Sequence, residues 1–353
     1  MMTSLDDVGF ATISEKRASS TSLHAPLARC HLVVTDRCNL RCVYCNRHDG
    51  DHMPTDLALA VIASWARDGL RTVMISGGEP TLHPDLEKIV ASCAAHDLAT
   101  IILATNGTAR LQTYEHLMRL GVTEFSVSLD SGDRARAATI HGTRVDVWDR
   151  VVATISGLCS AGARVVVGLI VNPYNEHTIV RDLTFIDTLG PVDIKVTPSS
   201  HHHHPHQLAD IARRIPDALL ERHPFLGYRM RRVRQGLPLK GLGATDSHHC
   251  WLCLDDMAVA RGHHYPCYIY QREAGDPIGP VAQEMQVVRR ERLDWIMATD
   301  THRDPICSRH CVDFYIDYNN RVARRLADEG GSRGTRCADP GHKSETARSV
   351  PGR

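Results

Sequence analysis

Short apolar runs rich in β-branched residues alternate with segments of helical period between residues 29 and 200. In one such segment Leu57, Val61, Ile62 and Trp65 fall on one face of a helix. Six strand and helix units in succession favour a parallel sheet, because each crossover between parallel strands needs a covering helix. A closed barrel has eight units, so the pattern predicts an α/β fold with a partial (β/α)6 TIM-like barrel. The six runs are Arg29–Thr35, Arg71–Ser76, Ala99–Thr105, Thr123–Leu129, Ala163–Val171 and Val192–Thr197.

The region after Thr197 has a different character. It passes through the histidine-rich segment PSSHHHHPHQ and the glycine-rich segment LPLKGLGATDSHH, and from Cys250 to Asn320 it is turn-rich and bears cysteines. This pattern is typical of a small domain organised by metal more than by apolar burial. The sequence therefore predicts a flexible leader at 1–27, the barrel at 28–235, a small auxiliary cluster domain at 245–322 and a polar tail at 323–353.

Charge and hydropathy exclude several classes of partner. Among 353 residues, 41 Lys and Arg balance 41 Asp and Glu, so no net field draws the chain to nucleic acid or to an anionic membrane. No apolar run of about 18 residues exists to cross a bilayer, and the first residues carry acids where a signal peptide needs an apolar core. We therefore expect a cytoplasmic protein with no nucleic-acid partner and no membrane partner.

Three of the 12 cysteines stand in the segment RCNLRCVYC, as Cys38, Cys42 and Cys45. Disulfides do not persist in a reducing cytoplasm whereas metal thiolates do, so metal binding is the first hypothesis. The segment directly follows the first predicted strand, at the end where barrel enzymes keep their active sites. Three sulfurs could belong to a zinc site with a distant fourth ligand, or to a four-iron cluster that leaves one iron open for a substrate or cosubstrate.

The C-x3-C-x2-C spacing, with Tyr44 before the last cysteine, resembles the signature of the radical S-adenosylmethionine (SAM) enzymes. The resemblance continues at the ends of the next three predicted strands, with Gly77–Pro80 (GGEP), Thr105–Gly107 (TNG) and Ser128–Asp130 (SLD). The stretch HGTRVDVWDRVVATISGLCSAGARVVVGLIVNPYNE, which runs into the fifth strand, is also similar to the family. Four matches at successive strand ends favour this family over a structural zinc site.

The resemblance implies that the three cysteines hold a [4Fe–4S] cluster whose fourth iron is chelated by SAM. One electron then cleaves the sulfonium, and the 5′-deoxyadenosyl radical abstracts a hydrogen atom from an unactivated C–H bond. The implied contacts to SAM are Tyr44 at the adenine, Gly77, Gly78 and Glu79 at the amino group, Ser128 and Arg144 at the carboxylate or ribose, Asn172 at the ribose or the substrate, and Pro80 and Asn106 nearby.

A second cysteine group follows the linker. Cys250-x2-Cys253-x13-Cys267 resembles the C-terminal motif of the molybdenum-cofactor enzyme that rearranges guanosine triphosphate. With Cys307-x3-Cys311 it looks more like the one-cluster twitch form of the SPASM extension of radical SAM enzymes, which carries an auxiliary [4Fe–4S] cluster. Five candidates exceed four places, and Cys250 is the first to be dropped; if Cys250 is a ligand, Cys307 or Cys311 is free. Three roles are open for such a cluster. It could accept the electron left after hydrogen abstraction, bind the substrate, or only stabilise the fold of a small domain.

Two further residues are candidates for catalysis. Asp130 ends the fourth predicted strand and could act as acid, base or hydrogen-bond acceptor. Lys195 and Thr197 face the same side of the sixth predicted strand, so either could reach the substrate or line the core. The histidines at 201–204 are interpreted as a solvated loop in preference to a metal site. Four other thiols are expected in the core or the tail: Cys30, Cys93, Cys159 and Cys337.

The leading hypothesis is a radical SAM enzyme that abstracts hydrogen from a small polar metabolite, such as a sugar, an aminocyclitol or a nucleoside, in natural-product or cofactor biosynthesis. Oxidation, dehydration, epimerisation and rearrangement remain open, and an electron donor such as flavodoxin or ferredoxin is expected. One alternative is the maturation of a ribosomally made peptide, which the short segment before the first strand disfavours. Another is a non-catalytic iron–sulfur redox protein, which leaves the GGEP and SLD segments unexplained. The chain ends in VPGR, without the terminal glycine pair of the guanosine triphosphate enzyme, so that reaction is not expected.

Overall fold

The computed structural model of the chain describes residues 18, 21–22, 27–45, 49–199, 205–282 and 284–334. In this part of the chain the strands form a 9-stranded sheet in the order β6-β5-β4-β3-β2-β1-β7-β8-β9. Each of the six predicted runs overlaps one of strands β1 to β6, and these strands are parallel to their neighbours. The strands are β1 (Arg29–Thr35), β2 (Thr72–Gly77), β3 (Thr100–Thr105), β4 (Glu124–Ser128), β5 (Arg164–Val171), β6 (Asp193–Pro198), β7 (Asp256–Ala260), β8 (His263–Tyr265) and β9 (Gly279–Pro280).

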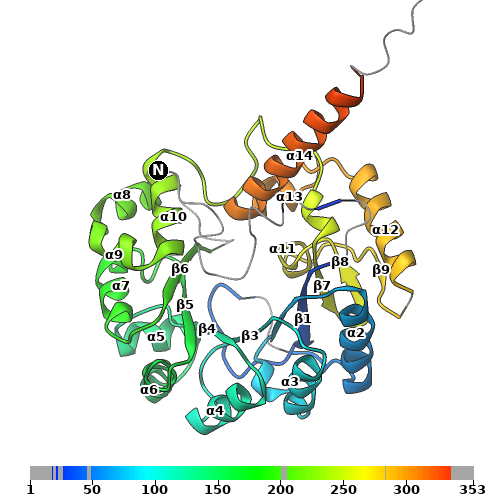
Figure 1. Cartoon of the computed structure of the whole chain (residues 1–353). Coiled ribbons are helices and arrows are strands. Elements are labelled where there is room, and N and C mark those ends of the chain that lie inside the picture. The colour runs from blue at the N-terminus through cyan, green and yellow to red at the C-terminus, as the bar shows by residue number, and fades with distance from the viewer. Residues whose placement is uncertain are drawn as a thin grey trace, which may run out of the picture.

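Helices follow each of the six parallel strands and lie outside the arc that the strands form (Figure 1). Their apolar period faces the sheet, as in α2, where Ala58, Val61, Ile62 and Trp65 are all buried. The helices are α2 (Thr55–Asp68), α3 (Leu86–Ala95), α4 (Leu111–Leu120), α5 (Arg134–His141), α6 (Val145–Ser160), α7 (Ile179–Asp187), α8 (Pro205–Arg214), α9 (Asp217–Arg222), α10 (Pro224–Arg234), α11 (Tyr268–Arg272), α12 (Met285–Ala298), α13 (Cys307–His310) and α14 (Asp313–Gly334), with short 3-10 helices η2 (Pro80–Leu82) and η3 (Trp251–Leu254). None of these helices is both long and apolar enough to cross a membrane.

The inner face of the arc is filled by the C-terminal segment of the chain. Met74, Ile102 and Val166 come from three barrel strands and share one buried cluster with Phe314 and Tyr318 of α14. Their neighbours along each strand pack instead against the outer helices, because successive side chains of a strand point to opposite faces. The start of helix α14 therefore supplies the core that the open barrel lacks.

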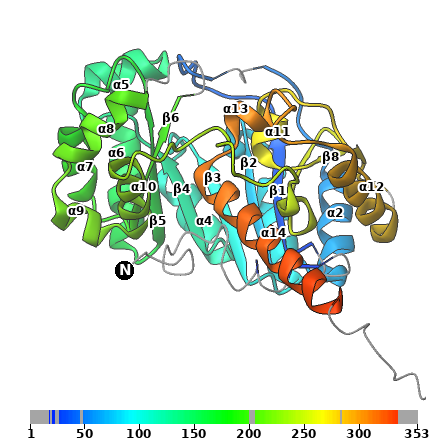
Figure 2. The same ribbon diagram turned by 90° about the horizontal axis from the view of Figure 1, so that it is seen from above.

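Both edges of the partial barrel are tied to this C-terminal segment, which lies on the open side of the arc in both views (Figures 1 and 2). At one edge β7 pairs in parallel with β1, with Arg29 opposite Asp256. At the other edge Arg229 of α10 donates to the carboxylate of Asp313 at 2.7 Å. The segment expected to form a separate small domain thus continues the sheet of the barrel and packs inside it.

Two expectations for the chain termini meet different outcomes. Helix α14 continues to Gly334, so the first part of the polar tail expected from residue 323 is helical. Of the leader expected at 1–27, residues 1–17, 19–20 and 23–26 lie outside the described residues, as do the histidines at 201–204 and Cys337.

Candidate active site

A cavity of about 270 Å³ lies where strands β1 to β6 end. The carboxyl ends of parallel strands meet at one edge of a sheet, so the four motifs that follow separate strands converge there. From the predicted site the cavity is lined by Cys38, Cys42, Tyr44, Cys45, Gly77, Gly78, Asn106 and Ser128. Residues that the sequence analysis did not select also line it, among them Ser76, Ser126, His141, Ser199, Lys240, Tyr268, Arg272 and Glu273.

The loop that carries the first three cysteines is held in place by its own backbone. Arg41 and Val43 donate their amides to the carbonyls of His141 and Ile140 at 2.9 Å, so the end of helix α5 forms one side of the loop. Burial, with the nearby Asp130 carboxylate, raises the pKa of Cys42. Coordination to iron removes the proton of a thiol, so a bound cluster would relieve this cost. Three half-buried sulfurs beside an open cavity fit a cluster that keeps one iron for a ligand.

The two glycines after β2 are required by a close approach of two backbone segments. A Cβ atom on Gly77 would lie 2.3 Å from the Thr35 carbonyl oxygen, and one on Gly78 would lie 2.3 Å from that of Arg37. The amide of Gly78 also donates to the Thr35 carbonyl at 2.8 Å. The glycine segment therefore lies directly against the start of the cysteine loop, where no side chain fits.

Glu79 connects the glycine segment to the end of β3. Its buried carboxylate accepts hydrogen bonds from the Thr81 amide at 3.1 Å, the hydroxyls of Thr81 and Thr105 at 2.7 Å and the Asn106 amide at 2.7 Å. Burial raises the pKa of Glu79, and these four hydrogen bonds oppose that rise. Pro80 begins the short helix η2 in the same turn. In this structure Glu79 and Pro80 shape the wall behind the cavity.

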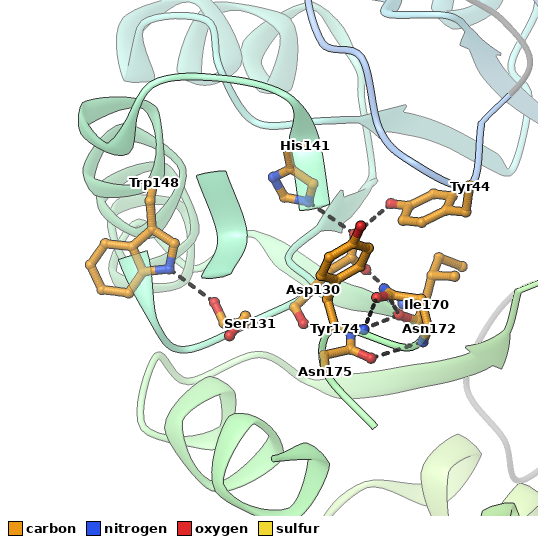
Figure 3. Close-up of polar contacts among 9 residues, drawn as sticks. All are labelled: Tyr44, Asp130, Ser131, His141, Trp148, Ile170, Asn172, Tyr174 and Asn175. Carbon is orange, nitrogen blue, oxygen red and sulfur yellow. Dashed lines mark hydrogen bonds and ion pairs between the residues drawn. The ribbon is translucent and has the colours of Figure 1, made fainter. Parts of the chain in front are cut away.

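Asp130 organises the other side of the cysteine loop (Figure 3). Its carboxylate accepts a short hydrogen bond from the Tyr44 hydroxyl, one from the Ile170 amide at 2.6 Å, and lies 2.9 Å from Nε2 of His141. Asp130 and His141 are both buried, and burial with the Asp130 charge raises the pKa of Tyr44. The side chain of Tyr44 is thereby held by its hydroxyl group. His141, the last residue of α5, was not selected in the sequence analysis, although it is the first residue of the HGTR stretch.

Three other predicted residues are not among those that line the cavity. Asn172 is buried, and its side chain bonds the Ile170 carbonyl and the Tyr174 amide at 3.0 Å, which shapes the turn after β5 (Figure 3). The side chain of Arg144 is 84% exposed and pairs with Asp146. Lys195 points its ammonium toward the ring of Phe314 at 5.9 Å, and burial with the Arg229 charge lowers its pKa to about 7.

The C-terminal segment supplies the wall opposite the cysteine loop. Tyr268 stacks on His31 of β1 at 3.7 Å between ring centroids. Arg272 pairs with Glu273 at 2.8 Å, and both line the cavity with Lys240. Burial and the Arg272 charge lower the pKa of Lys240 to about 7. Polar and aromatic groups therefore face the cysteine loop across the cavity.

Four cysteines of the second group line one small space. This space, of about 20 Å³, is bordered by Cys250, Cys267, Cys307 and Cys311. Burial raises the pKa of Cys311, and the neighbouring Cys250 and Cys267 raise it further. Cys253 belongs instead to a separate cluster with Leu254 and Ile296, where its Sγ lies 3.9 Å from the Arg292 carbonyl oxygen. Four converging sulfurs fit a fully coordinated iron–sulfur cluster.

Comparisons with known proteins show what this chain is similar to. Residues 32–186 match the model of the Radical SAM superfamily. GTP 3′,8-cyclase of Mycolicibacterium smegmatis is 39% identical over 139 residues, which cover 37% of this chain and 37% of that relative. A probable GTP 3′,8-cyclase of Methanococcus vannielii is 24% identical over 300 residues, which cover 78% of this chain and 95% of the relative.

Two solved structures share the fold. SuiB of Streptococcus suis bound to its precursor peptide SuiA has a TM-score of 0.59 and 17% identity, and the match covers 77% of this chain and 66% of that one. Native anSMEcpe with bound AdoMet has a TM-score of 0.59 and 14% identity, and the match covers 88% of this chain and 99% of that one. At these identities the likeness concerns the arrangement of strands and helices.

Proposed function

We propose that this chain is a radical SAM enzyme that abstracts a hydrogen atom from a small polar metabolite. The radical SAM family implies a [4Fe–4S] cluster and SAM, which when bound supply the 5′-deoxyadenosyl radical. The observation that carries the proposal is the single cavity in which the cysteine loop, the strand-end motifs and the C-terminal segment meet. In this proposal Cys38, Cys42 and Cys45 hold the cluster.

The residues around the cysteine loop position SAM in this proposal. Gly77 and Gly78, which line the cavity, contact its amino group through their backbone, and Tyr44 is held by Asp130 for contact with the adenine. Asn106 and Ser128 face the cavity from the ends of β3 and β4. Asp130 is a positioning residue, because both of its carboxylate oxygens are already engaged by protein donors. Arg144 faces away, and we leave it out of the proposed contacts.

The substrate is proposed to bind between this site and the C-terminal wall. Hydroxyl groups of Ser76, Ser126 and Ser199 line the cavity together with Lys240 and Arg272. Such a lining supports a ligand with several polar groups, as in a sugar, an aminocyclitol or a nucleoside. The relatives named GTP 3′,8-cyclase support a nucleoside or nucleotide among these classes. Electrons would come from a donor such as flavodoxin or ferredoxin, in the cytoplasm, where iron thiolates persist.

We assign the auxiliary cluster to Cys250, Cys267, Cys307 and Cys311, which line the same space. This set differs from the first choice made on spacing, which dropped Cys250. A cluster held by four thiolates has no iron left for a substrate, which leaves an electron acceptor or a purely structural cluster. Of these two roles we propose that it accepts the electron left after hydrogen abstraction. The reaction proposed is therefore a net oxidation. Cys253, three residues from Cys250, would serve as a core thiol.

The ligand set is tested by counting iron and sulfide in anaerobically prepared protein. About eight irons per chain are expected for two clusters. Cys253→Ser should keep both clusters, whereas Cys250→Ser should lose iron from the auxiliary cluster. Cys159→Ser, on the outer helix α6, is the matched control for a non-ligand thiol. An auxiliary cluster that survives Cys250→Ser and is lost in Cys253→Ser would refute the assignment.

The reaction is tested by turnover with SAM and a reductant against candidate substrates labelled with deuterium. Transfer of deuterium into 5′-deoxyadenosine is expected with a small polar metabolite, and Cys42→Ala should abolish it. Net oxidation predicts that one SAM is consumed for each product, whereas recycling of SAM would exclude it. Activity with a ribosomally made peptide and none with small metabolites would favour the peptide maturase, a possibility raised by the peptide bound to SuiB.

A further inference from the structure

Arg292 of helix α12 lies in the interior of the C-terminal segment, between the cysteine-bearing strands and loops. Its side chain is among the largest fully buried ones of the described residues. The guanidinium donates to the carbonyl oxygens of Cys253 at 2.7 Å, Asp256 at 2.5 Å, Tyr265 at 2.9 Å and Pro266 at 3.1 Å. One helix side chain thus holds both segments that carry Cys253 and Cys267.

This buried cation is not paired with a carboxylate. Within the described part of the chain no acid side chain forms an ion pair with Arg292, whereas the buried Arg229 and Arg29 pair with Asp313 and Asp256. Its remaining neighbour is Nδ1 of His264 at 3.3 Å. Burial and the Arg292 charge lower the pKa of His264 to about 4, so this imidazole is neutral near pH 7 and adds no negative charge.

A buried charge without a counter-ion is costly, since carbonyl dipoles replace only part of the lost hydration. The four thiolates of the proposed auxiliary cluster would supply negative charge close to the segments that Arg292 binds. The carbonyls that Arg292 binds belong to Cys253, three residues from Cys250, and to Pro266, which directly precedes Cys267.

We propose that Arg292 is the counter-charge of the auxiliary cluster and raises its reduction potential, so that it accepts an electron more readily. A cluster bound by four thiolates gains one more negative charge when reduced, and a fixed buried cation stabilises that state more than the oxidised one. The inference rests on the proposed auxiliary cluster. Arg292 acts through charge and through the position of the loop, and it is not a ligand.

The test compares the midpoint potential of the auxiliary cluster, followed by EPR during an anaerobic redox titration, in the parent, Arg292→Met and Arg292→Lys. The methionine variant should shift the potential to more negative values by about 59 mV, the equivalent of tenfold in a one-electron equilibrium. Burial lowers the pKa of Lys195 and Lys240 to about 7, so the titration is carried out at pH 6, where the lysine variant keeps its charge. It loses some of the hydrogen bonds of Arg292 but should stay close to the parent in potential. Arg289→Met is the matched control, because Arg289 lies on the same helix and pairs with Asp68.

A second variant keeps the proposal testable if Arg292→Met does not retain its auxiliary irons. Glu291 binds Nε2 of His264 at 3.1 Å, on the far side of the imidazole from Arg292. Glu291→Gln removes a negative charge bonded to the same imidazole and should shift the potential to more positive values. Potentials that are unchanged in both Arg292→Met and Glu291→Gln, or a lysine variant that shifts as far as the methionine variant, would overturn the proposal. Four irons in the parent in place of eight would instead refute the auxiliary cluster itself.

Discussion

Replacement of Gly78 by alanine probes the contact on which the first cysteine loop depends. The new Cβ atom would meet three backbone atoms, the oxygen and carbon of the Arg37 carbonyl at 2.3 and 2.6 Å and the Asp36 oxygen at 2.7 Å. Real contacts of this kind stay beyond 3.0 Å, so the loop must move by at least about 0.7 Å. Neither side can yield by a rotamer change, because all three atoms are backbone. Arg37 precedes Cys38, so the displacement reaches the first cluster ligand directly.

We expect Gly78→Ala to lower the stability of the metal-free protein by about 1–3 kcal/mol, the usual cost of overpacking. Retention of the first cluster should fall by on the order of 10–100-fold, as for other residues that orient metal ligands. The measurements are thermal unfolding of the apo protein and iron loss to a chelator under argon. Gly168→Ala is the control, because its Cβ atom would find only the Val127 oxygen, at 3.9 Å. A Gly78→Ala protein that unfolds and retains iron like the parent would refute the close-approach argument.

Three further predictions follow from the buried polar groups. In Glu79→Gln an amide NH2 group replaces one of the carboxylate oxygens that accept hydrogen bonds, so at least one buried donor loses its acceptor. Thermal unfolding should show that the free energy of unfolding falls by about 1–3 kcal/mol. Unchanged stability would contradict this. Asp130→Asn frees Tyr44 and His141 while keeping the shape of the side chain, so iron content should stay and formation of 5′-deoxyadenosine should fall by on the order of 10–100-fold; full activity would argue against a positioning role. The folded-state pKa of Lys195 is about 7 and the unfolded value is 10.5, so the unfolded chain binds more protons between these values and stability from this residue rises with pH there. Urea unfolding at pH 7 and pH 9 should show a smaller rise in Lys195→Met than in the parent, and equal slopes would oppose the lowered pKa.

The convergence of the first site could be predicted because it depends on strand order alone. Each motif directly follows a parallel strand, so Cys38, Gly77, Asn106 and Ser128 had to reach the same edge of the sheet. His141 could not be predicted in this way, because it reaches Asp130 from the end of a helix whose direction is set by packing. The role of Glu79 could not be predicted either. The sequence does not show whether its carboxylate points into the cavity or bonds to the protein behind it.

The pattern of apolar residues predicted the six parallel strands, and the spacing of the motifs indicated the kind of chemistry. Both signals are local, because the period of a strand and the residues at its end depend on neighbours in sequence. The tertiary structure decided which thiols of the second group meet. Cys250 and Cys253 are three residues apart, yet one faces Cys307 and Cys311 while the other packs against Ile296. The difference depends on how α12, α13 and α14 pack around β7. These contacts join segments far apart in the chain, so the spacing of the cysteines does not predict them.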